Sequence, residues 1–347
     1  MPLYEPDVPS RTIGVEEHFG TQAVLRGGAR RMVEAEGFAT TVAELLEVGA
    51  GRIEAMDRAG MDMQVLSLTA PGIEPLAPEE AVEAARAANE HLEATVRAWP
   101  ERLAGLAALP MSAPEAAAEE LERTIAEGFV GAVINGHSQG RYLDHPMFEP
   151  VLATAERLSV PFYLHPTPPP EPVISAHYAG EFPPEAAYRL AGAGWGWHHE
   201  TGTHALRLIL GGVFDRFPGL QIMLGHHGET IPLLLPRIER NLPQRVTGLA
   251  RPVRAYLREN FFYTFGGWNW MSMFEAVRRL VGPDRILFST DYPFGSMEEA
   301  HSFLGHIEVS GEERELIAHG NAERLLKIPA ARNETAQPAP APCNAAP

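Results

Sequence analysis

Cysteine, lysine and long apolar runs are all scarce in this sequence. Its one cysteine is Cys343 and its one lysine is Lys327. A single cysteine excludes an internal disulfide, and its Ala/Pro-rich surroundings cannot build a packed core around a thiol nucleophile. Lys327 follows a late helical pattern far from the predicted site, which argues against Schiff-base and pyridoxal chemistry. The chemistry that remains is that of metal ions, carboxylates and histidines.

Membranes and nucleic acids are not expected as partners. The start "MPLYEPDVPSR" has no apolar core like that of a signal peptide, and no run reaches the ~18 apolar residues of a membrane span. The 28 basic residues are outnumbered by 45 acidic ones, which gives a net charge of -17. The acidic side chains are scattered, as on a solvated surface, and disfavour nucleic acid. We expect a cytoplasmic protein.

Short apolar runs alternate with longer helical patterns along the chain. Helical periodicity covers residues 78–98, 113–127 and 146–158. The apolar runs predict about eight strands: "TIGVEEH", "MQVLSL", "LAGLAAL", "VGAVING", "VPFYLHP", "LQIMLGHHGE", "NFFYTFG" and "RILFSTDYPF". About eight such units in ~280 residues predict an α/β fold, a single-domain (β/α)₈ barrel.

The alternative fold is an open doubly wound sheet. It is disfavoured because the first strand ends in Glu and His and no Gly-rich phosphate turn follows it. We expect an N-terminal extension over 1–11, the barrel over 12–328 and a disordered Ala/Pro-rich tail over 329–347. Two connections, 27–51 and 167–202, are long and predict loops over the C-terminal face of the barrel.

Polar residues stand at the C-terminal ends of several predicted strands, where barrel active sites are built. Glu16 and His18 lie two apart, so in a strand both point into the barrel while Glu17 points away. The fifth strand ends in His165, and the eighth in Asp291. Two carboxylates and two imidazoles suit one divalent ion, Zn²⁺ or Mn²⁺, with Mg²⁺ as a further candidate. We therefore predict Glu16, His18, His165 and Asp291 as metal ligands.

Each of these residues alone has a simpler explanation. A histidine before proline, such as His165, is often a hydrogen-bonded structural residue, and Asp291 could cap the turn in "STDYP". His198, His199 and His204 in "GWGWHHETGTHALRL" are explained as well by capping and packing as by a role at the site. It is the recurrence of such groups at four strand ends that favours a metal site.

With these residues in place, the chain resembles the metal-dependent decarboxylases of the amidohydrolase superfamily, which include γ-resorcylate, 2,3-dihydroxybenzoate, 5-carboxyvanillate and aminocarboxymuconate semialdehyde decarboxylases. The resemblance runs from about residue 12 to 328. It rests on "EEHF", "RIEAMDRAGMDMQVLSL", "YLDHPMFEPVLATAERLSVPFYLHP", "ETGTHALRLILGGVFDRFPGLQIMLGHHGE" and "ILFSTDYPF". It implies the same four ligands, with His226 and Glu229 as catalytic residues beside them, and a homodimer or homotetramer.

The resemblance also suggests how an aromatic substrate is bound. Phe294, Trp195 and Trp197 look like aromatic walls for a flat ligand. His227 departs from many relatives and could add a polar contact. The segment "LTAPGIEP" lacks the arginine that relatives use for a second carboxylate, which favours a monocarboxylic hydroxybenzoate over aminocarboxymuconate semialdehyde.

The expected reaction is nonoxidative decarboxylation of an ortho-hydroxylated aromatic acid. Asp291 would protonate the ring carbon before CO₂ leaves, and His226, oriented by Glu229, would hold a substrate oxygen. One alternative is a metal-dependent hydrolase or hydratase acting on an amide, lactone or ring-cleavage product, with Asp291 as general base. A second is a non-catalytic barrel that binds a metal or small ligand.

Overall fold

The computed structural model describes residues 8–27, 29–34 and 37–330. Eight parallel strands form one sheet, and their order in the sheet follows their order in the chain. The strands are β1 (Ile13–Phe19), β2 (Met63–Leu68), β3 (Leu103–Ala108), β4 (Gly131–Asn135), β5 (Phe162–His165), β6 (Ile222–Leu224), β7 (Phe261–Thr264) and β8 (Ile286–Leu287).

Backbone hydrogen bonds join the first strand to the segment around the last strand and so close the barrel. The amide of Val15 donates to the carbonyl of Phe288 over 3.1 Å, and the amide of His18 donates to the carbonyl of Tyr292 over 2.7 Å. All residues of the eight strands are buried, as expected when side chains fill the interior and helices cover the outside. The predicted (β/α)₈ barrel is confirmed.

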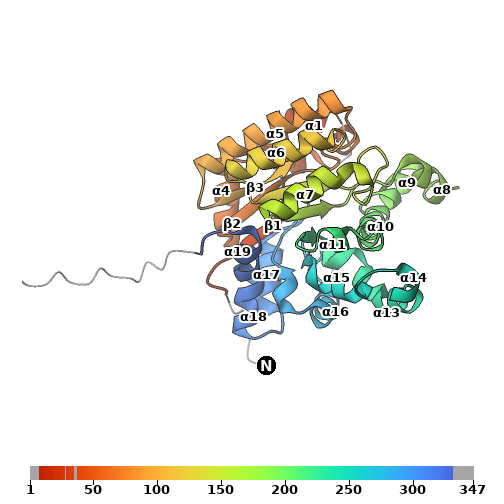
Figure 1. Ribbon diagram of the computed structural model, residues 1–347. Coiled ribbons are helices and arrows are strands. Elements are labelled where there is room, and N and C mark those ends of the chain that lie inside the picture. The colour runs from red at the N-terminus through yellow and green to blue at the C-terminus, as the bar shows by residue number, and fades with distance from the viewer. Residues whose placement is uncertain (1–7, 28, 35–36, 331–347) are drawn as a thin grey trace, which may run out of the picture.

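Helices follow the strands and surround the barrel (Figure 1). They are α1 (Gln22–Arg26), α2 (Arg30–Val33), α3 (Ala39–Leu46), α4 (Ala50–Ala59), α5 (Pro78–Ala98), α6 (Pro114–Ala126), η1 (Pro146–Phe148), α7 (Glu149–Leu158), α8 (Glu171–His177), α9 (Pro184–Ala191), α10 (Gly196–Leu210), α11 (Val213–Arg216), α12 (His226–Glu229), α13 (Ile231–Asn241), α14 (Gln244–Thr247), α15 (Val253–Glu259), α16 (Met271–Val281), η2 (Pro283–Arg285), α17 (Met297–His306), α18 (Gly311–Glu315), η3 (Leu316–Gly320) and α19 (Asn321–Leu326).

Helix α5 shows how local sequence and barrel packing agree. Pro78 occupies the first turn, where its missing N–H costs nothing, and acidic residues beside it suit the positive end of the helix. Its buried face includes Asn89, whose side-chain amide donates to the carbonyl of Ala108 over 2.9 Å and accepts from the amide of Ala108 over 2.8 Å. The paired bonds dock the helix against the end of β3.

Several predicted boundaries shift in the structure. Strands β6 and β8 end at Leu224 and Leu287, earlier than predicted, because the polar residues that follow leave the ladder and turn over the barrel mouth. The two long connections contain helices α2 and α3 and helices α8 and α9 with the start of α10. Most of the predicted N-terminal extension and C-terminal tail, with Cys343, lies outside the described residues. Within the described part, no helix is long and apolar enough to cross a bilayer.

Candidate active site

Glu16 and Glu17 occupy opposite faces of β1. Glu16 points inward, where the hydroxyl of Tyr163 donates to its Oε1 over 2.5 Å. Glu17 points outward, where its Oε1 accepts from the backbone amide of Thr290 over 2.8 Å and its Oε2 accepts from the side-chain amide of Gln64 over 3.3 Å. Burial raises the pKa of Glu17 to about 8. The predicted alternation therefore holds at these positions, although β1 carries one extra residue relative to β2 between Gly14 and Glu17.

The carboxylate of Glu16 is held tightly from several elements. Besides the bond from Tyr163 on β5, its Oε2 accepts a short hydrogen bond from the hydroxyl of Thr264 at the end of β7. Gly225 and Gly266 leave room for it. A Cβ atom at Gly225 would lie 2.6 Å from Oε1, and one at Gly266 would lie 2.8 Å from Oε2. The site therefore depends on glycine at both positions.

His18, His165 and Asp291 meet beside Glu16. Nε2 of His18 lies 3.0 Å from Oδ1 of Asp291, and the rings of His18 and His165 are 4.7 Å apart between centroids. On its other side, Nδ1 of His18 lies 3.2 Å from the hydroxyl of Ser67 at β2. Strands β1 and β5 and the segment after β8 thus bring these predicted ligands together.

The turns after β6 and β8 place functional side chains in left-handed backbone conformations. φ is 62° at Asp291, 48° at His226, 57° at His227 and 53° at Glu229. Non-glycine residues in this region cost about 1 kcal/mol or more each and cluster at functional sites. The amide of Asp291 donates to the carbonyl of Glu16 over 2.9 Å, which ties the eighth strand end to the first.

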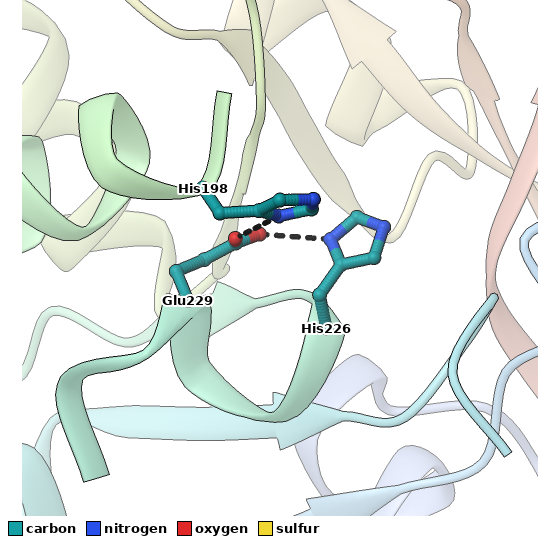
Figure 2. Close-up of side chains that lie close together, drawn as sticks. All are labelled: His198, His226 and Glu229. Carbon is teal, nitrogen blue, oxygen red and sulfur yellow. Dashed lines mark hydrogen bonds and ion pairs between the residues drawn. The ribbon is translucent and has the colours of Figure 1, made fainter. Parts of the chain in front are cut away.

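A buried carboxylate links two histidines on the other side of the site. Figure 2 shows Glu229 between His226 and His198. Its Oε1 lies 2.8 Å from Nδ1 of His226, and its Oε2 lies 2.7 Å from Nδ1 of His198. Nε2 of His226 then faces Oε1 of Glu16 at 3.6 Å and Oδ2 of Asp291 at 3.8 Å. His226 and Glu229 are thus placed next to the predicted ligands.

The donors at this end of the barrel fit a divalent cation. Glu16, His226 and Asp291 each offer one ligand atom, and these atoms all lie within 4.8 Å of one another. His18 and His165 lie alongside, and Nδ1 of His165 is buried without a hydrogen-bond partner among the described residues. Carboxylate and imidazole ligands suit Mn²⁺ and Zn²⁺.

Burial and mutual charge perturb the ionisation of these groups. Burial raises the pKa of Glu16 and lowers that of His165 well below its usual value. Burial also acts on Asp291 and His226, but their contacts oppose it. Hydrogen bonds with His18 and His226 lower the pKa of Asp291, and the charges of Glu16 and Glu229 raise that of His226 well above its usual value. A bound cation would offset the desolvation of the buried carboxylates.

Two of the predicted aromatic walls lie near the predicted metal ligands. The ring of Phe294, 40% exposed, has its centroid 5.6 Å from that of His18. The ring of Trp197 lies 6.4 Å from that of His165. Contact of either ring with a substrate stays a prediction.

The other two predicted substrate residues have partners within the protein. Trp195 is exposed, and its ring packs against that of His199, with the centroids 4.1 Å apart and the planes tilted by 43°. His227 is buried, and its Nε2 donates to the carbonyl of Trp268 over 2.8 Å. Burial lowers the pKa of His227 to about 4, so the ring is neutral near neutral pH. Their contact with substrate also stays a prediction.

Sequence reasoning missed several residues that support the site. Tyr163 could have been found, because it lies two residues before His165 on β5 and shares its inward face. Arg52 is buried on α4, and its Nη2 donates to the carbonyl of His18 over 2.5 Å. His198 appeared only as one of three equivalent histidines. The contacts of Arg52 and His198 depend on how helices pack against the barrel, which no local pattern encodes.

Comparison with known proteins gives the family. The amidohydrolase family model matches residues 42–328. The chain belongs to the amidohydrolase family. This confirms the resemblance inferred from the strand-end motifs.

Similar proteins within the family are decarboxylases. The γ-resorcylate decarboxylase of Polaromonas sp. (strain JS666 / ATCC BAA-500) is 39% identical over 329 residues, covering 91% of this chain and 98% of that protein. A crystal structure of dihydroxybenzoic acid decarboxylase from Polaromonas sp. JS666, with bound manganese and the inhibitor 2-nitroresorcinol, superposes with a TM-score of 0.85 at 36% identity over 94% of this chain and 99% of that one. A 2,6-dihydroxybenzoate decarboxylase complexed with 2,6-dihydroxybenzoate gives a TM-score of 0.83 at 35% identity, covering 92% and 99%. These relatives favour a carbon–carbon lyase over the hydrolase alternative.

Proposed function

We propose that the protein is a metal-dependent decarboxylase of ortho-hydroxylated benzoates. The observation that carries the proposal is the convergence of Glu16, His18, His165 and Asp291 at the mouth of the barrel, in a chain similar to dihydroxybenzoate decarboxylases. These four residues would hold one divalent ion, such as Mn²⁺ or Zn²⁺. When bound, the ion would act as a Lewis acid and template for the phenol and carboxylate oxygens.

Asp291 would carry the proton in this reaction. Direct loss of CO₂ would leave a carbanion in the ring plane, where the π-system cannot delocalise it. The contacts of Asp291 with His18 and His226 lower its pKa and favour the carboxylate form. Asp291 would take the proton of the ortho hydroxyl and return it to the carboxylate-bearing carbon. The C–C bond then breaks, CO₂ leaves, and its bonding electrons restore the aromatic ring of the phenolate product, which takes a proton from water.

His226 and Glu229 would hold the substrate in the reactive pose. The bond between Nδ1 of His226 and Glu229 turns Nε2 toward Glu16 and Asp291, where it can donate to a substrate oxygen. Phe294 and Trp197 would flank the ring, and Trp195 and His227 are further candidates for contact with it.

The substrate would be a monocarboxylic hydroxybenzoate. This choice rests on the missing arginine in residues 68–75 and on the 2,6-dihydroxybenzoate bound in a similar structure. We also propose a homodimer or homotetramer, as the family resemblance implies. Leu233 and Leu234 on α13, 54% and 50% exposed, are candidates for its interface. A cytoplasmic location stays a prediction.

Product analysis tests this function. The purified protein would be incubated in ¹⁸O-labelled water with salicylate, 2,3-dihydroxybenzoate or γ-resorcylate, and CO₂ and the organic product would be measured. We expect CO₂ and a phenol without ¹⁸O from at least one compound. Turnover that places ¹⁸O in the organic product would instead support the hydrolase or hydratase alternative, and stoichiometric metal without turnover of any compound would contradict the proposal.

A further inference from the structure

His198 is a buried histidine of the site that the proposed chemistry does not use. It lies in the first turn of α10, and its ring projects toward α12 (Figure 2). Nδ1 lies 2.7 Å from Oε2 of Glu229, and Nε2 lies 3.1 Å from the carbonyl oxygen of Ala193. The carboxylate of Glu229 accepts hydrogen bonds, so in the first of these contacts Nδ1 of His198 is the donor.

The two oxygens of Glu229 are divided between two imidazoles. Oε2 faces His198 and Oε1 faces His226. With only one of these bonds, the carboxylate group could rotate and leave its other oxygen buried without a hydrogen-bond donor. A buried acceptor without a donor costs about 1–3 kcal/mol. The second bond fixes the plane of the carboxylate, and with it the direction in which Oε1 meets His226.

Close packing between α10 and α12 maintains this arrangement. A Cβ atom at Gly202, one turn beyond His198, would lie 2.8 Å from the carbonyl oxygen of Glu229, so the two elements approach closely only because residue 202 is glycine. The ring of Trp268 covers His198 at 4.6 Å and His226 at 5.7 Å. Helix α10 therefore presents His198 to Glu229 from a rigid position.

We propose that His198 is a positioning residue for decarboxylation: its hydrogen bond to Glu229 orients that carboxylate, which in turn orients His226 toward the substrate. This inference rests on the proposed function. His198 does not touch the reacting atoms. It acts on His226 through Glu229, and its ring also packs edge-on against that of His226, with the centroids 4.9 Å apart.

Two variants of His198 separate hydrogen bonding from packing. His198→Phe fills the space beside Trp268 but removes the Nδ1 donor to Glu229, whereas the amide of His198→Asn can still donate to Oε2 of Glu229. With the metal-loaded protein and γ-resorcylate, we expect His198→Phe to lower kcat about 10- to 100-fold with little change in KM. His198→Asn should recover at least part of that loss, and the exposed His177→Asn should match the wild type.

A double variant tests whether His198 acts through Glu229. In the Glu229→Gln background, His198→Phe should change kcat by less than about twofold, because the group it positions is already altered. A full additional loss in that background would overturn the proposal. So would a lower melting temperature of His198→Phe with unchanged kcat, which would indicate a packing role only.

Two readouts do not require turnover. Metal content by mass spectrometry should be one ion per chain in the wild type and in His198→Phe. Loss of a second ion on substitution would mean that His198, His226 and Glu229 hold a metal instead, and would overturn the proposal.

In zinc-loaded protein with ¹⁵N-labelled histidine, the Nδ1–H signal of His226 should shift or weaken in His198→Phe. An unchanged signal would overturn the inference about His198. Absence of turnover with every hydroxybenzoate would count against the proposed function alone, because this signal can be read without turnover.

Discussion

At the scale of single residues, the site consists of titratable groups whose orientation is set by hydrogen bonds from neighbouring side chains. Glu16 is aligned by the hydroxyls of Tyr163 and Thr264, and the backbone of His18 by Arg52. Such supporting bonds are energetically important because a buried carboxylate oxygen without a donor is costly.

Asp291 gives the most direct prediction at this scale. Asp291→Asn keeps a carbonyl oxygen as a possible metal ligand but cannot carry a proton. We expect kcat for γ-resorcylate to fall about 10²- to 10⁴-fold while the protein still contains one metal ion per chain. Turnover is measured by CO₂ release and metal by mass spectrometry. Near-native turnover with the metal bound would show that another group carries the proton.

Tyr163 tests the support of Glu16. Tyr163→Phe removes the donor to Oε1, so we expect metal affinity, measured by titration of the chelated protein, to fall about 10- to 100-fold. Tyr256→Phe is the matched control, because it also loses a buried bond from tyrosine to a carboxylate, that of Asp215 at 2.5 Å, but on α15 and away from the ligands. An equal loss of metal affinity in both variants would refute the role of Tyr163.

Single residues also show what a sequence can and cannot reveal about the site. The grouping of Asp291 with Glu16 and His18 was predictable, because parallel strands all end at one face of the barrel. The importance of His198 was not, because its distance from Glu229 depends on the close approach of α10 permitted at Gly202.

At the scale of elements, strand ends and the turns after them build the site. The alternation of about eight short apolar runs with helical patterns, such as the one that forms α5, made the barrel predictable. The extra residue in β1 and the left-handed turn of α12 were not predictable, since both are imposed by contacts with neighbouring strands. The predicted sixth strand, "LQIMLGHHGE", therefore runs past Leu224, where β6 ends in the structure.

Gly225, between β6 and α12, links element geometry to the metal site. In Gly225→Ala the new methyl group would lie 2.6 Å from Oε1 of Glu16, and such overpacking costs about 1–3 kcal/mol. We expect a lower melting temperature and weaker metal binding. Gly311→Ala, at the start of α18 with no atom within 4 Å of its Cβ, should change neither. Normal metal affinity in Gly225→Ala would show that Glu16 can move without loss.

At the scale of the whole molecule, the barrel brings together site residues that lie far apart in sequence: Glu16 and Asp291 are 275 positions apart. The full chain has a net charge of -17, which keeps molecules apart unless a specific apolar face joins them. Leu233 and Leu234 on α13 are candidates for such a face (Figure 1).

Substitution on α13 tests the predicted oligomer. We expect the wild type to behave as a dimer or tetramer in light scattering coupled to gel filtration. The double variant Leu233→Glu with Leu234→Glu should shift the population toward the monomer, because charges would be buried in the contact. The exposed Val82→Glu on α5 serves as the control and should leave the mass unchanged. A monomeric wild type would contradict the predicted oligomer.

The most direct test of the account is a metal titration of the chelated protein with γ-resorcylate as substrate and CO₂ release as the readout. We predict that chelation abolishes turnover and that Mn²⁺ restores it linearly up to one equivalent per chain. In Glu16→Gln and His18→Asn, the same titration should restore little. Full turnover by metal-free protein, or none with one equivalent of Mn²⁺ bound, would contradict the assignment of a metal-dependent decarboxylase.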